Sequence, residues 1–204
     1  MDATLTRLTL ATAELAAALH GAPGALAPRL SGAERDATAL REQALADDTG
    51  TLTAAGVEWF QPLREPTYVF RIERSVLDLG AAQSFYVHLP TLRCVQVVAD
   101  GEDAYALTHL DVADVIYAGL LEAAGLWPEA HAELPPDALP PDAEDAVRTT
   151  LVVLRADEDG FTEHELSWLD DEGVWLIGED GTLSPASDFT LFQRIPLMLD
   201  VLDR

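Results

Sequence analysis

Short stretches of alternating apolar and polar residues run along much of this chain, and turns rich in aspartate and glycine follow them. In one such stretch, Phe70 and Ile72 alternate with an arginine and a glutamate. Period-two alternation is typical of strands with one buried face, and Asp-Gly turns are typical of antiparallel hairpins. A parallel sheet would need a long helix between successive strands. The sequence therefore predicts an α+β fold with antiparallel β-meanders at 65–108 and 148–178.

The same reasoning gives the expected elements. The alternation predicts strands at 68–74, 83–89, 92–99, 104–107, 149–155, 161–169 and 174–178. Apolar residues spaced by three and four predict helices at 4–20, 31–46, 53–63, 111–125 and 187–202. Residues that favour helix starts stand at Ser31, Thr53, Asp111 and Ser187. We expect the first helix and the last two to cover the sheet.

A proline-rich segment at 134–146 predicts a boundary within the chain. Its doubled Leu-Pro-Pro-Asp-Ala sequence favours a stiff, extended connector. The chain then divides into an N-terminal helical segment at 1–64, a first strand-meander and helix half at 65–133, this linker, and a second such half at 147–204. Either the two halves are related about a pseudo-two-fold axis, or two unrelated hairpins share the same Asp-Gly turn chemistry.

The acidity of the chain limits its partners. Among its 204 residues, 12 basic side chains, all arginine, stand against 36 acidic ones, which gives a net charge of −24. Hydrophobic residues make up 49% of the chain, so the composition is that of a globular domain and not of a disordered tail. A free-standing nucleic-acid binder is excluded, because affinity for phosphate comes from lysine and arginine. The lack of lysine and asparagine fits either a GC-rich genome or a salt-adapted cytoplasm.

The sequence also bears on location. Its apolar runs fall short of the roughly 18 residues that a membrane-spanning helix needs, so no membrane span is expected. Residues 1–4 lack the basic region of a secretory signal. We therefore expect a cytoplasmic protein.

Catalytic and metal-binding patterns fail at essential positions. A calcium loop, for example, would begin at Arg155 and end at Leu166, where oxygen ligands are required. A Gly-x-Ser-x-Gly elbow and a glycine-rich phosphate loop are both absent from the sequence. Glu163 and Glu165 would share one face of a strand and His164 the other, which predicts an exposed histidine and not a metal site. The sequence therefore predicts no catalytic residue, no metal and no cofactor.

Cys94 is the one cysteine, which excludes a disulfide framework and a zinc site built from cysteines. It lies in an apolar strand, and its basic neighbour Arg93 points to the opposite face. Because a reactive thiol needs a cation beside the sulfur, we expect a buried structural thiol. A pair between Cys94 and His88 across adjacent strands is an open alternative.

Two tryptophans flank an acidic turn in the second half. Trp168 and Trp175 lie on either side of Asp170, Asp171 and Glu172. In a tight hairpin the two indoles would form an aromatic surface beside carboxylates, which suits a partner that is both apolar and basic. These five residues, together with the strand around His164, are the partner-binding site that the sequence predicts.

Three stretches of the chain resemble the EspG-type chaperones of type VII secretion, an acidic and cytosolic actinobacterial family. They are 52–57, 95–101 with the following helix, and 173–181 with the C-terminal helix. The resemblance implies two related halves, each a β-sheet with helices, about a pseudo-two-fold axis. It also implies a PE–PPE protein pair, held by its tip, as the partner and no catalysis. The chain is shorter than is usual for that family, and no binding residue is carried over.

The sequence favours a non-enzymatic, acidic protein-binding module, either a chaperone or an adaptor. One alternative is an acidic decoy that occupies a nucleic-acid-binding surface, which would need carboxylates spaced like phosphates, whereas these cluster at turns. Another is an enzyme with an unrecognised carboxylate or histidine site, which would need carboxylates of raised pKa converging in a cleft.

The uneven charge predicts a response of stability to salt. Residues 1–99 hold 11 acidic and 8 basic side chains, whereas residues 100–204 hold 25 and 4, a net −21. Screening of their repulsion should raise the melting temperature from low salt to about 1 M, where the Debye length is about 3 Å. A flat or falling melting curve against salt would mean that the carboxylates are dispersed or paired.

Overall fold

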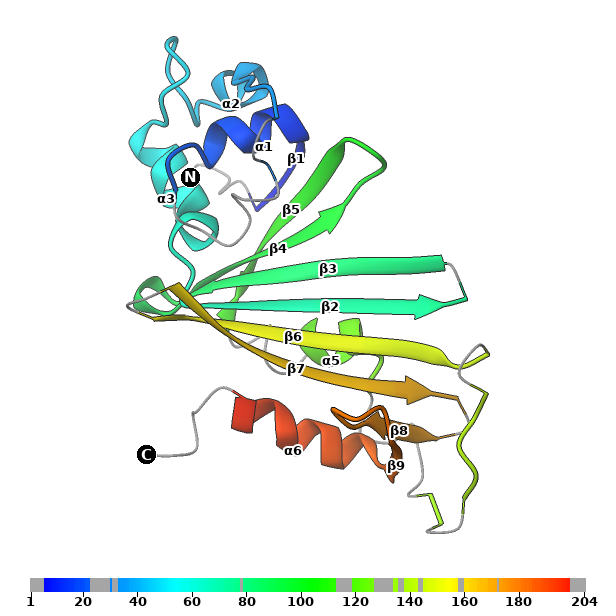
Figure 1. Ribbon diagram of the computed structural model, residues 1–204. Helices are drawn as coiled ribbons and strands as arrows, with labels where there is room; N and C mark the ends of the chain where they lie inside the picture. The colour runs from blue at the N-terminus through cyan, green and yellow to red at the C-terminus, as the bar shows by residue number, and fades with distance from the viewer. Residues whose placement is uncertain are drawn as a thin grey trace. The chain divides into compact units, whose positions relative to one another are not determined.

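An antiparallel β-sheet is the main element of the fold (Figure 1). The computed structural model describes residues 6–22, 30, 33–77, 79–112, 119–126, 134–135, 138–142, 145–157, 160–171 and 173–198. Nine strands within these residues make up the sheet, in the order β1 (Arg7–Ala11), β5 (Ala104–Asp111), β4 (Arg93–Ala99), β3 (Leu79–His88), β2 (Tyr68–Val76), β6 (Val147–Asp157), β7 (Gly160–Asp170), β8 (Val174–Ile177) and β9 (Leu183–Ala186). The predicted α+β fold with antiparallel strands is confirmed.

The chain falls into two compact units. The first consists of 1–69 with 84–115, and the second of 70–83 with 116–204. The proline-rich segment 134–146 therefore lies inside the second unit and does not mark the boundary between the units. The fourfold division of the chain and the relation between its halves remain predictions.

The first described element of the first unit is a strand, within the range 4–20 where the sequence predicted a helix. In β1, Leu8 and Leu10 are buried while their neighbours are exposed, and the strand pairs with β5. The helix α1 (Thr12–Ala18) starts only after it, and the Glu14 carboxylate accepts a hydrogen bond from the Ala11 N–H (2.9 Å). The prediction was right over 12–18 and wrong over 7–11, because the leucines of this segment fit both periods and pairing with β5 selects period two there.

One further helix prediction needs correction, and another is described only in part. In the described part of the helix expected over 31–46, which is 33–46, only α2 (Thr38–Glu42) forms, and the Asp36 carboxylate accepts the Thr38 N–H just before it (2.9 Å). Asp111 is the last residue of β5, and Val112 directly after it is helical, which agrees with a helix start at this point. Residues 113–118 lie outside the described residues, and the later part of the helix expected over 111–125 is described as α5 (Leu120–Ala124).

The helix predicted over 53–63 is confirmed as α3 (Ala54–Arg64). Its expected cap is also confirmed, because the Thr53 hydroxyl accepts the Gly56 N–H (3.2 Å). A single 3₁₀ turn, η2 (Leu89–Thr91), joins β3 to β4. Among the described residues, no helix combines the length and the apolar character needed to cross a membrane.

The second unit is organised around the β6–β7 hairpin, whose two strands have 11 residues each. Cross-strand partners share a face, so Leu151 and Val153 of β6 and Trp168 of β7 are buried together on one side. The short strands β8 and β9 continue the sheet, and β9 was not predicted. The final helix α6 (Asp188–Met198) starts as expected, since the Ser187 hydroxyl accepts the Thr190 N–H (3.2 Å). The last part of that prediction, 199–202, lies outside the described residues.

The two Asp-Gly turns differ in detail. The loop between β4 and β5 has four residues, 100–103, and the loop between β8 and β9 has five, 178–182. Asp100-Gly101 occupies the first two places of its loop, whereas Asp180-Gly181 occupies the third and fourth. The two Asp-Gly pairs therefore occupy different places in their turns, and both pairs lead into a strand before any helix.

Gly56 in α3 provides a test of the packing. A Cβ at this position would collide with the backbone carbonyl of Leu45, whose carbon would lie 2.9 Å away. Gly56→Ala should therefore lower the free energy of unfolding by about 2 kcal/mol, although alanine alone would favour the helix by about 1 kcal/mol. Urea unfolding measures the change.

Ala55→Gly is the matched control, because Ala55 is exposed in the same helix turn. It should cost only the propensity difference of about 1 kcal/mol. A Gly56→Ala protein more stable than the parent would contradict the close approach between α3 and Leu45.

Candidate functional site

Two side chains of the first unit have shifted pKa values, and burial explains both. Cys94 is fully buried, and burial raises the pKa of its thiol to about 12. Burial also lowers the pKa of His109, although its Nε2 donates to the Trp59 carbonyl oxygen (3.0 Å). His88, the alternative partner of the thiol, bonds through Nδ1 with the Thr91 hydroxyl (2.7 Å). The prediction of a buried structural thiol is confirmed.

In the part of the chain that the structure describes, no group of three or more His, Cys, Asp or Glu side chains could hold a metal ion. His164 is exposed on β7, as expected, and its neighbours Glu163 and Glu165 are exposed as well.

The aromatic surface predicted from Trp168 and Trp175 does not exist. In the β7–β8 hairpin Trp168 pairs with Leu176, and Trp175 pairs with Leu169. Adjacent residues of a strand point to opposite faces, so the two indoles lie on opposite sides of the sheet. Both are also buried, Trp175 in a small cluster with Leu169. These tryptophans stabilise the unit from within and offer no contact area at its surface.

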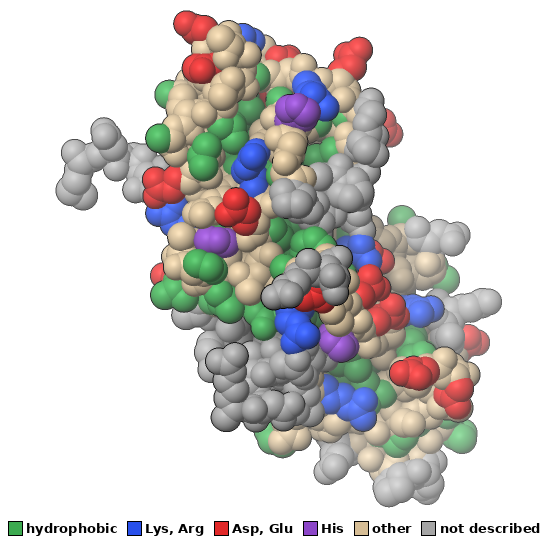
Figure 2. Space-filling model, turned by 60° about the vertical axis from the view of Figure 1, so that its left-hand side comes forward, with side chains coloured by type: hydrophobic (Ala, Val, Ile, Leu, Met, Phe, Trp, Pro, Cys, Tyr) green, Lys and Arg blue, Asp and Glu red, His purple; other side chains and the backbone are tan. Residues whose placement is uncertain are grey.

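The acidic residues of the predicted site have different positions. Asp170 ends β7 and is half-buried, whereas Asp171 is exposed in the turn. Glu172 lies outside the described residues. Figure 2 shows acidic side chains in small groups among arginines on the displayed face, not as one continuous patch. A partner-binding role for this turn remains a prediction.

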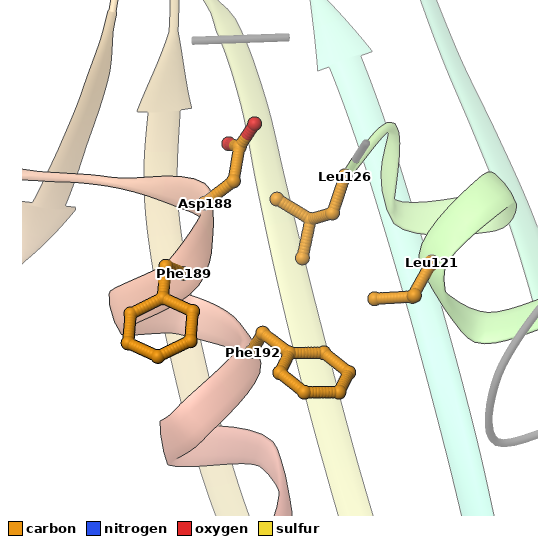
Figure 3. A pocket seen from close by; sticks show the side chains of 5 residues that line it. All are labelled: Leu121, Leu126, Asp188, Phe189 and Phe192. Atoms are coloured by element: carbon orange, nitrogen blue, oxygen red, sulfur yellow. The ribbon is translucent and has the colours of Figure 1, made fainter. Parts of the chain in front are cut away.

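An apolar pocket that the sequence did not predict lies between α5 and α6. Its volume is about 240 Å³, and Leu121, Leu126, Asp188, Phe189 and Phe192 line it. Figure 3 shows the two leucines on one side facing the two phenylalanines on the other, with the Asp188 side chain at one end. Phe189 stands at the pocket with 65% of its surface exposed.

A signal for this pocket is present in the sequence. Leu191 and Ile195 of α6 are buried and form one apolar stripe along the helix. Phe189 and Phe192 form a neighbouring i, i+3 pair that widens the apolar face beyond what packing on the sheet requires. A helix with more apolar face than its own fold covers has surface left for another molecule.

A second hollow of the same unit is polar and lies along β7. Its volume is about 920 Å³. The residues that line it come from three strands, the loop after β8, and α6: Arg148, Glu163, His164, Glu165, Leu166, Ser167, Ile177, Gly178, Glu179, Gly181 and Arg194. It includes the strand around His164, which belonged to the predicted site, but none of the five residues of the predicted tryptophan hairpin.

Comparison with known proteins adds no family to this geometry. Neither the models of known protein families nor the curated protein sequences match the chain.

The burial of Cys94 predicts a thiol that is inert in the folded protein. With a pKa of about 12, the thiol carries very little reactive thiolate at pH 8. Alkylation by iodoacetamide at pH 8 should be at least about a hundredfold slower in the native protein than in urea. Mass spectrometry of the alkylated chain measures both rates. Equal rates would place the sulfur at the surface and reopen a role for it in chemistry.

Proposed function

We propose that this chain is a cytoplasmic, non-enzymatic protein-binding module, a chaperone or adaptor that holds a protein partner. The observation that carries the proposal is the apolar pocket between α5 and α6, with Phe189 exposed beside it. A large aromatic side chain left 65% exposed next to an apolar pocket is a feature of interaction surfaces.

The pocket has the size for a side chain of a partner. An apolar cavity of about 150 Å³ already admits a benzene molecule. At about 240 Å³, this pocket has room for an aromatic or branched aliphatic side chain. Covering Phe189 at the same time removes further apolar surface from water, and a fully buried phenylalanine is worth about 1.5–3 kcal/mol.

The charge of the chain supplies the second part of the recognition. A net charge of −24 attracts a basic partner and speeds the encounter more than it adds affinity. The partner proposed here therefore presents an apolar side chain for the pocket and basic residues around it.

The resemblance to EspG-type chaperones supports the same proposal. It names the tip of a PE–PPE pair as the partner, and it adds the proposal that the two halves of the chain are related about a pseudo-two-fold axis. Such a chaperone needs a shaped surface and no catalytic group.

A binding experiment with a matched control tests the proposal. The full chain is used to capture proteins from the lysate of its source, and the captured protein is identified by mass spectrometry and purified. Its affinity is then measured for the parent chain, for Phe189→Ser and for Leu139→Ser. Leu139 is 87% exposed and does not line the pocket, so it controls for the loss of an exposed apolar side chain.

The expected result is a loss of about tenfold to a hundredfold for Phe189→Ser and no loss for Leu139→Ser. Melting temperatures of the three chains should agree, since both side chains are exposed. Equal affinities, or a nucleic-acid enzyme as the captured protein, would contradict the proposal, and the latter would support the acidic decoy.

A further inference from the structure

We infer that β7 accepts an extended segment of another protein as an added strand, and that this segment carries lysine or arginine at alternate positions. The surface is separate from the pocket between α5 and α6, and the inference does not rest on that pocket. It rests on the pairing of β7, on the hollow beside it and on two glutamates.

The edge of β7 is only partly used. The strand has 11 residues, all paired with β6, but only Ser167 to Asp170 pair with β8. Figure 1 shows β8 beside one end of β7 only. In the described part of the chain, the stretch from Gly160 to Leu166 has a strand on one side alone.

The hydrogen-bonding direction of this edge follows from the next hairpin. The Gly178 N–H donates to the Thr182 carbonyl (2.8 Å), so Gly178 directs its backbone groups toward the returning chain. Alternate residues of an antiparallel strand point their backbone groups to opposite sides, so Ile177 faces β7 and its partner Ser167 faces β8. By the same alternation, Phe161, Glu163 and Glu165 direct their N–H and C=O groups to the open side.

Space for an added strand exists at this place. The polar hollow of about 920 Å³ is lined by consecutive β7 residues from Glu163 to Ser167 and by Ile177 at the end of β8. Glu163, His164 and Glu165 are all exposed, so no described side chain has to be removed from a core when a strand docks.

The side chains of the edge select the charge of the added strand. Glu163 and Glu165 lie on one face of β7, and the Ser167 hydroxyl donates to Glu165 Oε1 (3.0 Å) and holds it in place. Residues directly opposite on an added strand face these carboxylates, and opposite charges there are favourable. Arg148 and Arg194 also line the hollow, so its total charge does not by itself select a basic strand. The preference for lysine or arginine comes from the two positions of the added strand that lie opposite Glu163 and Glu165.

A second copy of this chain is a poor occupant of the same edge. Two copies of β7 paired antiparallel about Glu163 would place that residue opposite itself. Pairing about His164 would place Glu163 opposite Glu165. Like charges directly opposite destabilise a strand pair, and charged edges are a common protection against self-association. In these two registers the glutamates therefore disfavour the chain's own edge, whereas they favour a basic segment.

The test uses three synthetic seven-residue peptides and the full chain. The first alternates valine with lysine, the second alternates valine with glutamate, and the third is the lysine peptide with N-methylated backbone amides on its bonding edge. Affinities are measured by fluorescence anisotropy at fixed ionic strength for the parent chain, for the Glu163→Lys, Glu165→Lys double variant, and for a Glu42→Lys, Glu102→Lys control. The control residues are exposed and outside the hollow, and the variant gives the same change in net charge.

The inference predicts that the parent chain binds the lysine peptide and neither of the other two. The Glu163→Lys, Glu165→Lys variant should lose about tenfold in affinity for the lysine peptide and gain affinity for the glutamate peptide, while the control should change by less than about twofold. If the control lost as much affinity for the lysine peptide as the Glu163→Lys, Glu165→Lys variant, the peptide would be held by general charge attraction, and this result would contradict the inference. Equal binding of the N-methylated peptide, or no binding of the lysine peptide, would overturn strand addition. Phe189→Ser should leave these affinities unchanged, which separates this result from that of the pocket.

Discussion

The register of β7 between β6 and β8 determines what the second unit buries and what it exposes. Because Trp168 is opposite Leu176 and not opposite Trp175, the two indoles point to opposite faces and both enter the interior. A slip of one residue would reverse every side chain of the strand. The same register, with a β8 of only four residues, leaves the backbone of Glu163 and Glu165 at an open edge. The register of β7 and the short length of β8 thus explain both the burial of the two tryptophans and the open edge.

The second unit has two surfaces of different character. The pocket between α5 and α6 is apolar and suits a side chain of a partner. The edge of β7 is polar and suits a main chain, with Glu163 and Glu165 setting the charge of what it accepts. Cys94 and His109 have shifted pKa values, which can indicate a catalytic role. Here burial in the first unit explains both shifts.

Much of the strand pattern could be predicted from the sequence, because alternation and turn residues act locally. The helix over 4–20 was wrong where leucines fit two periods and the pairing of β1 with β5, distant in sequence, decided between them. The tryptophan surface was wrong because the faces of a hairpin depend on the length of its loop, here three residues between Asp170 and Val174. The length of β8, which creates the open edge, and the approach of α5 to α6 are tertiary features that no local pattern encodes.

Amide hydrogen exchange along β7, followed residue by residue by NMR, tests the central claim about its register. The account predicts alternation: slow exchange at Thr162, His164 and Leu166, whose N–H groups face β6, and fast exchange at Phe161, Glu163 and Glu165, which face the open side. Ser167 and Leu169 should be slow again, because β8 covers that side there. Uniformly slow exchange from Phe161 to Leu166, or slow exchange at Glu163 with fast exchange at His164, would contradict the account.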